Sequence, residues 1–195
     1  MNAIIGWIRN GWRGALVALI VTCGAAGFLG HPSGSRADGV TGTLPSPLTR
    51  NREAIGGFER RYGISSTLAG TIYHQARELG VQPGIVFELI RVESQFDPRA
   101  IGSQGERGLM QIKPATARAY DRQLTPHDLM DPAVNVRIGL RHLLEEVGHF
   151  EGDWTLGLQA YHRGRTGLRR ALASRVRLDT AYADRILAHC DVPPS

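Results

Sequence analysis

The chain has 195 residues, which is enough for one domain with a hydrophobic core and a short appendage. Its formal net charge of +5 falls to +2 if residues 1–37 are removed, because that segment holds three arginines and no acid. We do not expect such a weakly basic domain to bind nucleic acid. The two cysteines and seven histidines show no metal-ligand spacing, so we expect no metal site and no cofactor.

The first 37 residues have the pattern of a secretory signal. A positive start precedes an uncharged run over residues 14–30, and Ser35 and Ala37 have the spacing that a signal peptidase reads. We predict a signal peptide over residues 1–37, with an uncleaved N-terminal anchor as the alternative. Either would place the protein in the periplasm or cell envelope, with membrane contact only through this segment. Residues 38–50 are rich in Gly, Pro, Ser and Thr and are typical of a linker.

Helix signals dominate the chain from residue 51 onward. Gly80 follows a run with apolar residues at helical spacing and predicts the end of that helix. Residues 83–94 begin with Pro83 and are apolar on nearly every side, which predicts a central, buried helix. Asp131 and Asp153 stand where N-caps are expected. The predicted helices are 51–62, 66–80, 83–94, 113–121, 131–150, 153–164, 167–174 and 179–190.

No segment alternates apolar and polar residues as a strand would, and no internal repeat is found. We therefore predict an all-α fold, a compact single domain over residues 51–195.

Glu93 is the first candidate for chemistry. It lies three residues after Ile90 and four after Leu89, so a helix places it on or beside an apolar face. A poorly solvated carboxyl has a raised pKa and can give its proton to a leaving oxygen near neutral pH. The alternative from position alone is a solvated residue at a frayed helix end.

Glu93 belongs to the first of four motifs that follow one another along the chain. They are Glu93-Ser94 with Phe96 and Pro98, "GERGLMQIKPATA" from Gly105 to Ala117, "DPAVNVRIGLRHL" from Asp131 to Leu143, and "QAYHRG" from Gln159 to Gly164. Together they resemble the soluble lytic transglycosylase family over roughly residues 80–190. The resemblance implies a lysozyme-like helical fold and cleavage of peptidoglycan glycan strands.

The resemblance also implies roles for individual residues. Glu93 matches the single catalytic acid of the family. Met110 and Gln111 match a segment that lines the sugar groove, where Gln111 would contact glycan. The alternatives are a core position for Met110 and a helix-capping or loop hydrogen bond for Gln111. Tyr161 matches a tyrosine whose hydroxyl lies near the acid; the alternative is a buried aromatic with a hydrogen-bonded hydroxyl.

Two positions depart from the family pattern. Gly102 stands where relatives commonly have Ser, so the glycan-contacting hydroxyl is carried to the neighbouring Ser103. His162 replaces the Asn of the Ala-Tyr-Asn motif. A histidine can replace one amide hydrogen bond, but it can also become charged at mildly acidic pH.

A one-acid mechanism fits this sequence best. Glu93 would protonate the oxygen between N-acetylmuramic acid (MurNAc) and N-acetylglucosamine (GlcNAc), then act as base to form a 1,6-anhydro product. Asp97 and Glu106 are the other acids nearby. Asp97 is expected to cap or turn the chain, and Glu106 to pair with Arg107.

The first alternative function is a goose-type lysozyme of the same fold, which would use one of these acids to position water. A non-catalytic wall-binding or assembly module is the second. A further hypothesis makes a secretion system or pilus the partner.

Overall fold

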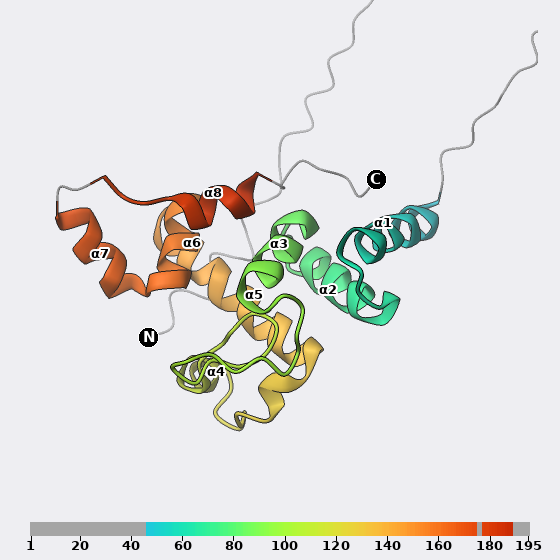
Figure 1. Cartoon of the computed structure of the whole chain (residues 1–195), viewed down its shortest axis with the longest axis horizontal. Helices are drawn as coiled ribbons and strands as arrows, with labels where there is room; N and C mark the ends of the chain where they lie inside the picture. Colours follow the sequence, from blue (N-terminus) through green and yellow to red (C-terminus); the bar gives the residue numbers. More distant parts are fainter. Residues whose placement is uncertain (1–45, 175–176, 189–195) are drawn as a thin grey trace, which may run out of the picture. The chain divides into compact units, whose positions relative to one another are not determined.

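The computed structural model describes residues 46–174 and 177–188, and most of them are helical (Figure 1). The predicted signal peptide 1–37, most of the predicted linker and Cys190 lie outside these residues. The helices are α1 (Pro47–Tyr62), α2 (Ser66–Glu78), α3 (Pro83–Ser94), α4 (Pro114–Tyr120), the 3₁₀ turn η1 (Asp128–Met130), α5 (Pro132–His149), α6 (Trp154–Arg163), α7 (Arg165–Ala173) and α8 (Ala181–Leu187).

Capping residues explain where several helices begin. The side chains of Asp131 and Asp153 accept hydrogen bonds from backbone N–H groups in the first turns of α5 and α6, as predicted. Helix α1 begins at Pro47, inside the segment predicted to be a linker, because Ser46 supplies a cap and Pro47 suits the first turn. The predicted start of α3 at Pro83 is confirmed, and α5 likewise begins at a proline, Pro132.

Helix α3 runs through the core. Every residue from Gly84 to Ile90 is buried, and the ring of Phe87 stacks on that of Phe58 at a centroid distance of 3.9 Å. Glu88 is buried in the same helix and accepts hydrogen bonds from Tyr62 (2.9 Å) and Arg91 (2.7 Å). These contacts fix α3, and Glu93 in its last turn is fixed with it.

Helix α5 is the second central element. It packs against both α2 and α6, and α6 in turn contacts α7 and α8 (Figure 1). Gly139 allows the close approach of Met110, whose side chain occupies the space that a Cβ at position 139 would need. Helix α8 contacts both α3 and α6, so residues distant in sequence lie close together there.

The segment between α3 and α4, residues 95–113, is held as a compact loop. Two isolated β-bridges join Ile101 to Arg107 and Arg107 to Ile112. Asn135 on α5 is fully buried; it accepts a bond from the backbone N–H of Met110 and donates to the carbonyl oxygens of Arg107 and Leu129, each at 2.8 Å. A single buried amide therefore anchors the loop to α5.

None of the helices in residues 46–174 and 177–188 combines the length and apolar character that crossing a membrane requires.

Candidate active site

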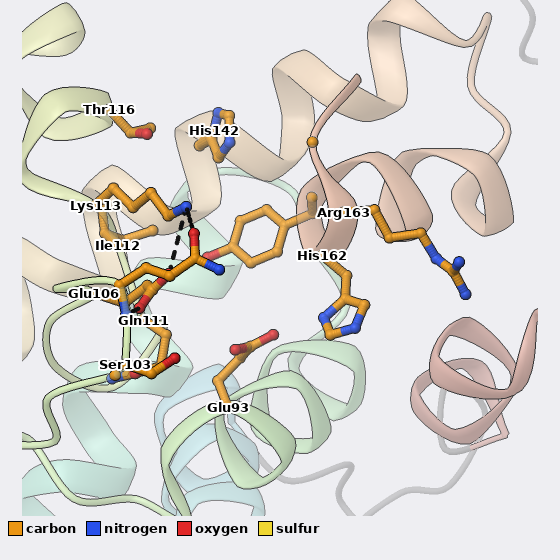
Figure 2. Close-up of a pocket in the computed structure, with 14 residues that line it drawn as sticks. Glu93, Ser103, Glu106, Gln111, Ile112, Lys113, Thr116, His142, His162 and Arg163 are labelled. Carbon is orange, nitrogen blue, oxygen red and sulfur yellow. Dashed lines mark hydrogen bonds and ion pairs between the residues drawn. The ribbon is translucent and has the colours of Figure 1, made fainter. Parts of the chain in front are cut away.

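A pocket of about 470 Å³ opens beside the end of α3 (Figure 2). Its walls come from α3, the 95–113 loop, α4, α5, α6 and the residue after α6. Of the six site residues predicted from the sequence, five line it: Glu93, Ser103, Gln111, Tyr161 and His162. Residues from each of the four motifs thus line one cavity.

Glu93 enters the pocket from the last turn of α3. Burial raises the pKa of its carboxyl above the usual range, and the charge of Glu106 raises it further, while a hydrogen bond from Tyr182 acts in the opposite direction. The net effect keeps the proton on Glu93 at a higher pH than an exposed glutamate would. Within the described part of the chain, the hydrogen bond to the Glu93 carboxylate is made at Oε1.

Tyr182 of α8 is the direct partner of Glu93. Its hydroxyl donates to Glu93 Oε1 across 89 residues of sequence. Its ring stacks on that of His162, with centroids 4.2 Å apart and planes 18° from parallel. Tyr182 was not among the predicted site residues. The only sequence signal for it was its position in a predicted helix, since nothing local links that helix to Glu93.

Tyr161 lines the pocket but has a different hydrogen-bond partner. Its hydroxyl donates to the carbonyl oxygen of Met110 at 2.7 Å, and its ring lies 5.3 Å from that of His142. Burial raises the pKa of Tyr161 well above the usual value, and the nearby charge of Glu93 adds to this. The tyrosine therefore lies near the acid, yet its hydroxyl ties α6 to the loop.

Met110 is the sixth predicted residue, and the structure places its side chain in the core. It is 0 % exposed, packs against Gly139 and does not line the pocket. The prediction that it lines the groove needs this correction: its backbone carbonyl holds Tyr161, and its side chain supports the wall from behind.

Gln111 lies on the loop side of the pocket. Its Nε2 donates to the carbonyl oxygens of Gly108 (2.8 Å) and Ala100 (3.3 Å). Its φ of +48° is in the left-handed region that non-glycine residues seldom adopt. A strained backbone conformation of this kind persists only where the surrounding structure holds it. The two hydrogen bonds of Nε2 then fix the direction of the Gln111 side chain.

Glu106 and Lys113 form a pair on the same side of the pocket. Glu106 Oε1 lies 3.5 Å from Lys113 Nζ, and Oε2 accepts a hydrogen bond from the backbone N–H of Gln104 at 3.0 Å. The predicted pairing with the Arg107 side chain is wrong, because that guanidinium donates to the backbone carbonyl of Glu106 instead. Burial acts to raise the pKa of Glu106, but the two backbone N–H groups and Lys113 outweigh it and lower the pKa.

Asp97 does not reach the pocket. Its carboxylate accepts a hydrogen bond from the backbone N–H of Arg99 at 2.8 Å, which is the chain-turning role predicted for it. Glu106 is therefore the acid that shares the pocket with Glu93.

His162 faces the pocket from the last turn of α6 (Figure 2). Burial, and then the charge of Arg163, lower the pKa of its imidazole. The ring is thus largely neutral near pH 7 and can act as a hydrogen-bond partner, as the replaced asparagine would. Within residues 46–174 and 177–188, no three His, Cys, Asp or Glu side chains gather in a way that would hold a metal ion.

Comparison with curated proteins finds lytic enzymes of phages and bacteria. A transglycosylase of Enterobacteria phage PRD1 is 33% identical over 94 residues, which cover 48% of this chain and 34% of that protein. A putative soluble lytic murein transglycosylase of Haemophilus influenzae is 33% identical over 93 residues, covering 45% of this chain and 16% of that protein. The matched regions are thus about a third or less of these relatives.

Solved structures give the same result. The lytic transglycosylase Slt of Pseudomonas aeruginosa, in an inactive mutant, matches with a TM-score of 0.50 and 27% identity over 60% of this chain and 20% of that chain. The 70 kDa soluble lytic transglycosylase of Escherichia coli matches with a TM-score of 0.52 and 23% identity over 72% of this chain and 29% of that one. These matches confirm the predicted all-α, lysozyme-like fold. The sequence model of the transglycosylase SLT domain family matches residues 70–183, more than half of the chain. The chain therefore belongs to the transglycosylase SLT domain family.

Proposed function

We propose that this chain is a peptidoglycan lytic transglycosylase that cleaves the MurNAc–GlcNAc bond, with Glu93 as its general acid and then its base. The observation that carries the proposal is the state of Glu93. Its carboxyl is partly withdrawn from water, has a raised pKa and is held by Tyr182 at the edge of the pocket. A carboxyl in that state can be protonated before the reaction and still accept a proton afterwards.

In the first step the proton of Glu93 moves to the oxygen between MurNAc and GlcNAc. The bond from that oxygen to MurNAc C1 breaks, and GlcNAc leaves with a new hydroxyl. The carbonyl oxygen of the MurNAc N-acetyl group bonds to C1 and takes up the positive charge. The substrate thus supplies the group that a second carboxylate supplies in many glycosidases.

In the second step Glu93, now a carboxylate, removes the proton from the 6-hydroxyl of the same MurNAc. The 6-oxygen bonds to C1, the bond to the N-acetyl oxygen breaks, and a 1,6-anhydro sugar is released without water. The Tyr182 hydrogen bond holds the Glu93 carboxyl in one orientation through both proton transfers.

Digestion of purified peptidoglycan tests the proposal, with the released fragments identified by mass spectrometry. We expect 1,6-anhydro ends from the wild type and a loss of about a hundredfold to ten-thousandfold in Glu93→Gln. Glu78→Gln is the matched control, because Glu78 also ends a helix but is exposed and lies outside the pocket. Wild-type activity in Glu93→Gln would remove Glu93 from this role.

One observation supports the goose-type lysozyme alternative: Glu106 lines the same pocket as Glu93. A hydrolase would release reducing ends, which are heavier than anhydro ends by one water molecule. Wall binding with no released fragment would instead support the non-catalytic module.

The cell-envelope location is part of the same proposal, since the substrate lies there. Fractionation of cells that express the whole chain, with N-terminal sequencing of the product, tests both the location and removal of residues 1–37. A secretion system or pilus as partner is a separate hypothesis, which the neighbouring genes would test.

A further inference from the structure

The Glu106–Lys113 pair is a built feature of the pocket wall. Lys113 Nζ donates to Gln104 Oε1 at 2.7 Å and lies 3.5 Å from Glu106 Oε1. Glu106 Oε2 is in turn fixed by the backbone N–H of Gln104. The carboxylate therefore has one direction in the pocket and a fixed counter-charge (Figure 2).

Gly102 provides the space that this arrangement needs. A Cβ at this position would overlap Glu106 Oε2, and it would come within 2.7 Å of Gln111 Oε1. Any larger residue at position 102 would displace the carboxylate or the amide from the wall. The observed position of the Glu106 carboxylate therefore requires glycine at position 102.

Glu106 and Glu93 are coupled across the pocket. Both line the pocket, Glu93 from α3 and Glu106 from the 95–113 loop, and the charge of Glu106 contributes to the raised pKa of Glu93. The other groups that face Glu93 are Tyr182 of α8 and the α6 residues Tyr161 and His162. His142 of α5 and Arg163 of α6 complete the titratable and charged lining. Glu106 is therefore the one acid besides Glu93 among the described residues of the lining.

We propose that Glu106 is a second functional carboxylate, which remains an anion throughout and stabilises the positive charge that develops on the sugar bound against Glu93, with Lys113 setting the strength of that anion. This inference rests on the proposed function. Glu106 forms no bond to the substrate and exchanges no proton in either step. Its charge acts on the positive C1 and N-acetyl group of the sugar, whereas Glu93 exchanges protons with the glycosidic oxygen and the 6-hydroxyl. The Glu106 side chain is 19% exposed, so its charge is partly shielded from water.

The two members of the pair should have opposite effects on Glu93. Glu106→Gln removes a negative charge, so the proton of Glu93 is lost at a lower pH. Lys113→Gln removes the compensating positive charge, so the proton is retained to a higher pH. Shifts of opposite sign show that both charges reach Glu93, and the fall in kcat of Glu106→Gln tests whether the anion also stabilises the positive charge on the sugar.

The experiment is the pH profile of peptidoglycan cleavage for wild type, Glu106→Gln, Lys113→Gln and the double variant. For Glu106→Gln we expect kcat to fall about tenfold to a hundredfold, and the alkaline limb to move down by roughly half a unit to one unit. Lys113→Gln should move that limb upward, and the double variant should return it toward the wild-type position. Asp97→Asn is the matched control, because this loop acid lies outside the pocket.

Glutamine at position 106 still accepts the bond from Gln104, so the loop should stay folded, which circular dichroism checks. If it does not, Lys113→Gln alone still tests the inference, because it leaves Glu106 intact. An unmoved limb with kcat within about twofold of wild type in Glu106→Gln, or shifts of the same sign in both variants, would overturn it. Failure of the proposed function would look different: the wild type would release no anhydro ends, or Glu93→Gln would remain active.

Discussion

Two carboxyl groups reach the same pocket from regions of different character. Glu93 belongs to the α3–α8 wall, formed with Tyr182, where burial raises its pKa. Glu106 belongs to the loop wall, formed with Gln104 and Lys113, where backbone N–H groups and an ammonium lower its pKa. One group is suited to carry a proton and the other to remain charged. Divergent environments of this kind are how a site assigns different roles to identical side chains.

The largest effect should follow from detaching the loop wall from the core. Asn135→Ala removes the partner of Met110 N–H and of the carbonyl oxygens of Arg107 and Leu129. Leaving these buried groups unpaired should lower the unfolding free energy by about 2 to 5 kcal/mol, as measured by denaturant unfolding. Activity should fall as well, because the loop no longer holds Glu106 in place.

Asn51→Ala is the control for this change. Asn51 accepts a single hydrogen bond, from Tyr73, at a part-buried position away from the pocket. Its loss should cost about 1 kcal/mol and leave activity unchanged. Equal losses of stability in the two variants would contradict the anchoring role of Asn135.

Local signals explain what could be predicted from the sequence. Pro83, Asp131 and Asp153 mark helix starts through chemistry within one turn, so the bounds of α3, α5 and α6 were close to those observed. Helix α1 was predicted too short at its start, because Ser46 and Pro47 lie in a segment whose composition resembles a linker. The motifs around Glu93 and Gln111 gave most of the site, because they are contiguous in sequence.

Contacts between distant segments could not be predicted in the same way. Tyr182 lies 89 residues from Glu93, and the packing of α8 on α3 and α6 alone brings them together. The partner of Glu106 was assigned to its neighbour Arg107, yet the loop folds so that Lys113 is the partner. In both cases tertiary packing decides, and no pattern along the chain encodes it.

Tyr182→Phe should have the next largest effect, on the α3–α8 wall alone. Without the hydroxyl, the Glu93 carboxyl loses its orienting partner, and activity should fall about tenfold. The same hydrogen bond lowers the pKa of Glu93, so its removal should move the alkaline limb of the pH profile upward. Tyr73→Phe, which removes a hydroxyl bonded to Asn51, should change neither. A downward shift in Tyr182→Phe would contradict the geometry.

Replacing the two carboxyls by amides should change the unfolding free energy in opposite directions. The raised pKa of Glu93 favours the fold at low pH, and this contribution is lost as the pH rises through that pKa. Glu93→Gln should therefore raise the unfolding free energy at pH 8. The pKa of Glu106 is lowered in the folded state, so this group stabilises the fold above its unfolded-state pKa, and the stabilisation is lost as the pH falls through the folded-state pKa. Glu106→Gln should therefore lower the unfolding free energy at pH 8, by less than about 1 kcal/mol. Changes of the same sign would mean that the two walls do not differ as described.

The smallest effect is expected for His162→Asn, at the junction of α6 and α8. The pKa of His162 is lowered by burial, so its ring is neutral near pH 7.5, and activity there should change by less than about threefold. At acidic pH the ring gains a positive charge beside Tyr182, close to the sugar that becomes cationic in the proposed mechanism. Asparagine cannot be protonated, so the variant should lose less activity than the wild type as the pH falls below the histidine pKa. His127→Asn, an exposed residue outside the pocket, should leave the acidic limb unmoved. An unmoved acidic limb in His162→Asn would show that the ring charge does not reach the reacting sugar, and that the electrostatics of this site depend on the two carboxyls and Lys113.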